Sequence, residues 1–157
     1  MDGILRTDVE IDGLDATKKL VKLINESRHK QQLKVVMLDG ITVGGFNIID
    51  IKQLHQDTGL PVIVFNRRHP DLKSVKRALD NLNNPEVRWK MIKSAGKIKE
   101  CKLQNDEKIY YQSIGIYDED AEDALMLSST HGDIPEPLRV AHLIATAIVR
   151  GESYGRA

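Results

Sequence analysis

Residues 34–65 read KVVMLDGITVGGFNIIDIKQLHQDTGLPVIVF, and this stretch decides the fold class. Its two ends, residues 34–38 and 61–65, are short continuous apolar runs, which are typical of strands buried on both faces of a parallel sheet. Between them, residues 48–58 have a helical pattern, and Gly59 stands where a helix C-terminus favours glycine. A strand, a helix and a second strand in this order predict a parallel core with a helical connection.

The flanking segments add further helices and strands to this core. Residues 3–11 are rich in β-branched and apolar side chains and end at an Asp-Gly turn signal, so we expect a strand there. We expect helices over 16–29, with Asp15 as N-cap, and over 70–82, 85–95, 118–129 and 135–150, and a β-hairpin with strands at 97–103 and 108–114. The last helix is apolar around much of its circumference, which predicts burial on several sides. The prediction is one α/β domain with a mainly parallel central sheet and a hairpin at its edge or surface.

Composition excludes several classes of protein. The chain has 157 residues and 23 basic and 23 acidic side chains, so the formal net charge is zero and a bulk polycation is excluded. A single cysteine, Cys101, excludes a disulfide framework or a cysteine-based zinc site within one chain. No apolar run approaches the ~18 residues of a membrane span. We therefore expect a soluble, cytoplasmic domain over residues 1–157 that has no membrane partner.

Charge is distributed unevenly along the chain. Residues 66–108 carry 12 basic and 6 acidic side chains, whereas residues 117–136 carry 7 acids and no lysine or arginine. One interpretation is a set of ordinary solvated helices. The other is a basic flank that binds a polyanion, with the acids placed elsewhere to set orientation.

Two loops follow the predicted buried strands, and ligands of open parallel sheets bind beyond such strand ends. Asp39 comes directly after the first strand, where its carboxylate either binds a cation such as Mg²⁺ or caps a turn with Gly40. Arg67 and Arg68 follow the second strand and suit bidentate phosphate contacts, unless they form an exposed basic turn. Gly44 and Gly45 suit either close approach to a phosphate or a tight turn.

The last predicted helix carries an acid, an arginine and a histidine at every third position, Glu136, Arg139 and His142. This stripe is either the solvent face of the helix or a set of side chains that contributes to a site. Other catalytic patterns are absent, since the sequence contains neither a GxSxG elbow nor an HExxH motif.

Several runs of sequence resemble the archaeal endonuclease dU family. They are DGILRTDVEIDGLDAT from residue 2, VVMLDGIT from residue 35, GFNIIDI from residue 45, LHQDTGLPVIV from residue 54, GDIPEPLRVAHLIA from residue 132 and RGESYGRA from residue 150. The family is similar to endonuclease V and has an RNase H-like three-layer fold. The resemblance covers essentially the whole chain, and it implies metal-dependent cleavage of DNA that contains deoxyuridine.

The resemblance also implies roles for individual residues. Asp39 and Asp15 match acids that bind Mg²⁺ or Mn²⁺ and carry catalysis, and Glu136 or His142 is a candidate third ligand. In this interpretation the nucleic acid contacts Arg67, Arg68, Gly44, Gly45 and Asn47. Two metal ions about 4 Å apart would hold the attacking water and the leaving oxygen of a phosphodiester.

Family members usually begin with two more strands, the first of which carries an acidic pair, and this chain begins where their third strand begins. In a site without that pair, both the affinity for metal and the reaction rate are expected to fall steeply. The unpaired first strand is also expected to favour a homodimer through main-chain hydrogen bonds. The alternative to a DNA endonuclease is therefore a non-catalytic RNase H-like binding module or oligomer. A third alternative is an enzyme acting on a small phosphate compound through the glycines and arginines.

Overall fold

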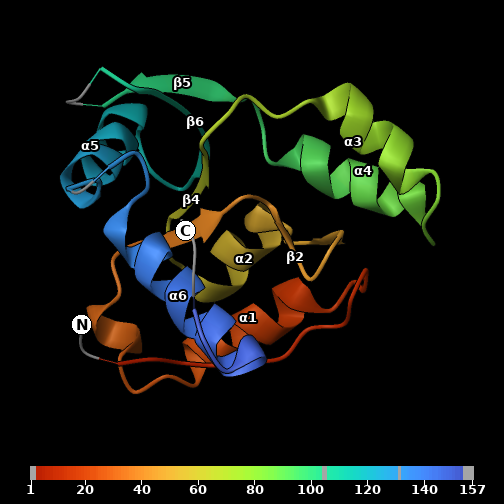
Figure 1. Cartoon of the computed structure of the whole chain (residues 1–157), viewed down its shortest axis with the longest axis horizontal. Helices are drawn as coiled ribbons and strands as arrows, with labels where there is room; N and C mark the ends of the chain where they lie inside the picture. The colour runs from red at the N-terminus through yellow and green to blue at the C-terminus, as the bar shows by residue number, and fades with distance from the viewer. Residues whose placement is uncertain (1–2, 104–105, 131, 154–157) are drawn as a thin grey trace.

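The structure, a computed structural model, describes residues 3–103, 106–130 and 132–153. Its main sheet has four strands in the order β1 (Val36–Asp39), β4 (Val62–Asn66), β6 (Lys108–Ile114) and β5 (Lys99–Lys102) (Figure 1). β1 and β4 are parallel, whereas β6 is antiparallel to both of its neighbours. The predicted α/β class and the hairpin at the sheet edge are confirmed, and the sheet is mixed, with its parallel pairing between β1 and β4.

Helices cover both faces of this sheet and make a three-layer structure. On β4, Val62 and Val64 face one layer, and Ile63 and Phe65 face the other. The first layer contains α1 (Ala16–Asn25) and α2 (Ile51–Thr58), and the second contains α5 (Asp118–Ser128) and α6 (Glu136–Arg150). The continuous apolar run that the sequence shows at β4 is thus explained by burial on both sides.

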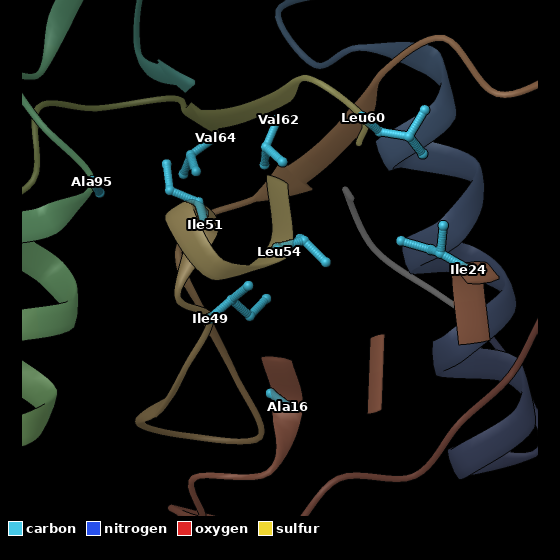
Figure 2. Packing of buried hydrophobic residues seen from close by; sticks show 9 residues of the cluster. All are labelled: Ala16, Ile24, Ile49, Ile51, Leu54, Leu60, Val62, Val64 and Ala95. Atoms are coloured by element: carbon cyan, nitrogen blue, oxygen red, sulfur yellow. The ribbon is translucent and has the colours of Figure 1, made fainter. Parts of the chain in front are cut away.

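Figure 2 shows the apolar cluster between the sheet and the first helical layer. Ile51 and Leu54 of α2 lie under Val62 and Val64, and all four side chains are fully buried. Burying aliphatic side chains of this size stabilises a fold by roughly 1.5–3 kcal/mol each. The predicted crossover between β1 and β4 therefore also supplies part of the apolar core.

The crossover begins with a small hairpin made of β2 (Thr42–Val43) and β3 (Asn47–Ile48). A third apolar cluster joins this hairpin to α3 (Leu72–Leu79) and α4 (Pro85–Ser94) through Ile48, Leu79 and Ile92. α3 and α4 lie side by side at the end of the molecule opposite α5 (Figure 1). A short 3-10 helix (Lys30–Gln32) follows α1.

Helix ends follow the expected local chemistry. The side chains of Asp50 and Asp71 accept hydrogen bonds from backbone N–H groups at the start of α2 and α3. Gly59 ends α2 in the left-handed conformation, with φ of 72°, as its position in the sequence predicts. Among the helices of the described ranges, none is long and apolar enough to cross a membrane.

Four sequence predictions are wrong in detail. The helix predicted over 48–58 begins at Ile51, because Ile48 pairs with Thr42 in the β2–β3 hairpin. Residues 3–11 form no strand, because the segment has no strand beside it, and Ile4 and Leu5 remain about half exposed. α1 ends at Asn25 instead of residue 29, because residues 26–29 form turns that lead into the 3-10 helix. α6 is not buried on several sides, because it covers the sheet from outside and Val149 is 83% exposed.

Candidate functional site

An open depression of about 460 Å³ lies where the two parallel strands, β1 and β4, end. Asp39 pairs with Phe65 in register, so the residues that follow both strands meet at one edge of the sheet. The N–H of Gly40 donates to the carbonyl of Phe65 at 2.8 Å and extends this pairing by one residue. The depression is lined by Asp39, Gly40, Phe65, Asn66, Arg67 and Arg68.

Asp39 and Arg68 provide the two available charges of this depression. Both side chains are exposed, and neither has a hydrogen-bond or ion-pair partner within the described ranges of the chain. Asp39 was predicted from its place after a buried strand, and the structure puts it at that edge. A carboxylate and a guanidinium that face solvent together can hold a phosphate and orient a water molecule beside it.

Arg67 also lines the depression, but its guanidinium is paired within the protein. Its Nε lies 2.7 Å from Oδ2 of Asp133, and Nη2 donates to Oδ1 at 3.2 Å. Asp133 belongs to the loop between α5 and α6, so this ion pair connects the strand end to the second helical layer. A phosphate at Arg67 would compete with Asp133, a contact that the sequence pattern does not reveal.

Asp15 does not line the depression of Asp39. Its carboxylate lies 2.6 Å from Nζ of Lys19 and accepts hydrogen bonds from the N–H of Glu10 and from Nδ2 of Asn47. The Lys19 hydrogen bond, followed by that of Asn47, lowers the pKa of Asp15 to about 2. Asp15 stands at the N-cap position of α1 without capping it, and its contacts hold the preceding turn.

The predicted nucleic-acid contacts at Gly44, Gly45 and Asn47 lie elsewhere. Asn47 is fully buried; its amide NH₂ donates to Glu10 and Asp15, and its oxygen accepts from the N–H of Ala16. A Cβ atom on Gly45 would lie 2.4 Å from Oδ1 of Asp12, and both glycines have positive φ. These three residues therefore hold the β2–β3 turn against residues 9–15.

The three predicted residues of α6 also lie outside the depression. Arg139 forms a bidentate ion pair with Glu136, with Nε donating at 2.8 Å, and this pairing raises the pKa of Arg139. His142 is exposed on the next turn of the helix. The stripe thus consists of an internal ion pair and a solvent-exposed histidine.

The side chains at this edge do not form a metal centre by themselves. No group of three or more His, Cys, Asp or Glu residues comes together in residues 3–103, 106–130 and 132–153. Asp39 supplies one carboxylate to the depression, whereas a two-metal centre needs several to balance charge and fix geometry. The described residues therefore do not fit the metal pair that the family resemblance implies.

Arg88 organises a second polar site, which no motif in the sequence indicates. This side chain is only 2% exposed and donates to the carbonyls of Asn83 at 2.9 Å, Gly13 at 2.8 Å and Phe46 at 2.5 Å, and also to that of Asp12. Arg88 lies four residues before the buried Ile92, and this spacing is the local signal in the sequence that puts both side chains on the inner face of α4.

Comparisons with known proteins agree with the resemblance. The family model described as endonuclease dU matches residues 1–149. A UPF0215 protein of Methanosarcina acetivorans is 51% identical over 158 residues, which cover 100% of this chain and 81% of that protein. A UPF0215 protein of Archaeoglobus fulgidus is 41% identical over 100% of this chain and 84% of its own length.

A solved structure gives the same result for the fold. The crystal structure of a protein of unknown function from Archaeoglobus fulgidus matches with a TM-score of 0.88 and 41% identity, over 96% of this chain and 84% of that chain. Identity at this level together with a family model that spans nearly all of the sequence is decisive. The chain belongs to the endonuclease dU family.

Proposed function

We propose that this chain binds DNA at the depression beside Asp39 and acts there as a nuclease on strands that contain deoxyuridine. The family description supports the class of reaction and the deoxyuridine substrate. The observation that carries the proposal is that an unpartnered carboxylate, Asp39, and an unpartnered guanidinium, Arg68, line the same depression where two parallel strands end.

Each of the two side chains has a defined part in this proposal. The planar guanidinium of Arg68 suits two hydrogen bonds to the oxygens of one phosphate. The carboxylate of Asp39 accepts a hydrogen bond from a water molecule and orients it beside that phosphate. Mg²⁺ or Mn²⁺ belongs to the proposal through the resemblance alone, because the described carboxylates do not form a metal cluster.

The test is a duplex with a single deoxyuridine, assayed for binding and for nicking with Mg²⁺ and with Mn²⁺. We expect Asp39→Asn to remove nicking and to leave DNA binding in place. We expect Arg68→Ala to weaken binding and to reduce the slope of log affinity against log salt by about 1. Nicking by Asp39→Asn at the wild-type rate would refute the assignment.

Matched controls come from exposed residues of α2. Asp57→Asn removes the same kind of charge as Asp39→Asn, and Lys52→Ala removes one exposed cation, as does Arg68→Ala. Both controls should bind and nick DNA as the wild type does. An affinity that stays constant between about 50 and 200 mM salt would exclude DNA as the partner, because binding through phosphates weakens steeply over that range.

A second candidate function is DNA binding without cleavage. It is favoured by the absence of a carboxylate cluster within the described residues. In the same assay it predicts a steep dependence of affinity on salt and a requirement for Arg68, with no nicking in either metal. The homodimer was predicted through an unpaired first strand, and residues 3–11 form no strand. Sedimentation of the purified chain tests whether a dimer forms.

A further inference from the structure

We propose that a second cavity, between residues 10–14 and the loop that joins α3 to α4, binds a single nucleobase through its hydrogen-bonding edge. The cavity has a volume of about 530 Å³, within the ~300–1,000 Å³ range of small-molecule sites. Its ligand class is a base with an imide edge, such as uracil. The choice of uracil rests on the proposed function. The inference that the cavity binds a nucleobase rests on its lining residues alone.

Three asparagines of one loop, Asn81, Asn83 and Asn84, line this cavity. Their side chains are exposed and have no hydrogen-bond partner in the part of the chain that the structure describes. An amide side chain offers a donor and an acceptor side by side, which complements the adjacent acceptor and donor of a base edge. Asn84 has φ of 57° and stands at the N-cap position of α4 without capping the helix, so its amide remains available.

The opposite wall supplies apolar surface for the flat face of a base. Ile11 is 83% exposed and Leu14 is 38% exposed, and both line the cavity. Exposed aliphatic side chains beside unpaired amides form a mixed surface. A nucleobase has this same combination of an apolar face and a polar edge, and flipped bases are bound in this way.

Arg88 fixes the distance between the two walls. Its guanidinium donates to the carbonyls of Asp12 and Gly13 on one wall and of Asn83 on the other. The Asp12 carboxylate also accepts a hydrogen bond of 2.7 Å from the N–H of Phe46, which fastens the turn to the β2–β3 hairpin. A cavity held in this way before the ligand arrives loses little entropy on binding.

The guanidinium also places a buried positive charge at the cavity, whose lining includes the acidic residues Glu10 and Asp12 as well. Arg88 is buried, and no carboxylate of the described residues lies within ion-pair distance of it. A buried cation without a counter-charge produces a stronger field than an exposed one, because little water screens it. This field favours the carbonyl oxygens of an imide base.

The two sites are close enough for one DNA strand to reach both. Asp39 is five residues from Gly44, a distance of at most ~17 Å along an extended chain. Gly44 in turn contacts the wall of the second cavity that residues 10–14 form, because its carbonyl accepts a hydrogen bond of 2.8 Å from the N–H of Asp12. At ~3.4 Å for each stacked nucleotide, about five nucleotides span this separation.

The test is a titration of the ¹⁵N-labelled chain with deoxyuridine 5′-monophosphate, and in parallel with deoxyribose 5-phosphate, which lacks a base. We expect the nucleotide to shift the side-chain amide signals of Asn81, Asn83 and Asn84 and the sugar phosphate to leave them unchanged. The double variant Asn81→Ala and Asn83→Ala should bind the nucleotide about 10-fold more weakly. Its thermal unfolding should match that of the wild type, because both side chains are unpaired, and Gln56→Ala on α2 is the matched control.

Unchanged asparagine signals, equal shifts with the sugar phosphate, or wild-type affinity in the double variant would each overturn the proposal. Arg68→Ala separates the two proposals, because that residue lies outside the second cavity. Asparagine shifts that persist in Arg68→Ala show that the base site does not depend on the first depression. If the wild-type chain shows these shifts but neither binds nor nicks the duplex, the proposed nuclease function fails and the base site remains.

Discussion

Arg88→Ala is expected to destabilise the chain by about 3 kcal/mol. Four carbonyls lose their donor, and three of them, on Asp12, Gly13 and Asn83, line a cavity that water can enter. We assign roughly 0.5 kcal/mol to each of these three, since water replaces the lost donor. The carbonyl of Phe46 does not line that cavity and is left unsatisfied, which costs about 1–3 kcal/mol.

Arg88→Lys should lower the free energy of unfolding by roughly half as much, about 1.5 kcal/mol. An ammonium group is a point donor and does not reach both residues 10–14 and the α3–α4 loop, as a planar guanidinium does. Urea unfolding followed by circular dichroism measures the differences, provided that the denaturant slope is the same in each variant. Lys90→Ala, exposed on the same helix, is the control and should stay within about 0.5 kcal/mol of the wild type. If Arg88→Ala unfolds as Lys90→Ala does, or Arg88→Lys as the wild type does, the four-carbonyl account is incorrect.

Three further predictions follow from single contacts. Gly45→Ala should destabilise the chain by about 1–3 kcal/mol in thermal unfolding, because φ is 80° and the new Cβ meets Oδ1 of Asp12. Hydrogen bonding to Lys19 lowers the pKa of Asp15 to about 2. The ionised side chain therefore contributes fully to the free energy of unfolding above about pH 4, and this contribution falls as pH drops toward 2. The stability difference between the wild type and Asp15→Asn should therefore shrink over that range in urea titrations. Asp133→Ala removes the carboxylate that pairs with Arg67 and should strengthen DNA binding. The slope of log affinity against log salt, measured by filter binding, should become steeper by up to about 1, which corresponds to one added phosphate contact.

Much of the fold is predictable from the sequence because local patterns determine it. The apolar run at β4 requires burial on both faces, and Gly59 and Asp71 end or begin helices through bonds within one turn of chain. The segment 3–11 has an equally clear β pattern, yet it forms no strand. A strand depends on a neighbour for its hydrogen bonds, and a pattern within one segment carries no information on that neighbour.

The candidate site divides in the same way. Asp39 and Arg68 were predictable because strand order alone places the residues after two parallel strands at one edge. Asn47 was predicted as a contact for nucleic acid and lies in the interior instead, bonded to residues that are 31 to 37 positions away. Arg88 reaches partners up to 76 positions away. The engagement of a polar side chain depends on such distant groups, which spacing in the sequence does not show.

This division determines how mutational data on the family are to be interpreted. Asp39 and Arg68 have no internal partner among the described residues, so their substitution is expected to change function at nearly constant stability. Asn47, Asp15 and Arg88 hold residues 10–15 in place, so their substitution loosens both that turn and the second cavity. Loss of activity in an Asn47 variant is therefore no evidence of contact with DNA unless its free energy of unfolding is unchanged. Stability has to be measured beside activity before any residue of this turn is assigned to the chemistry.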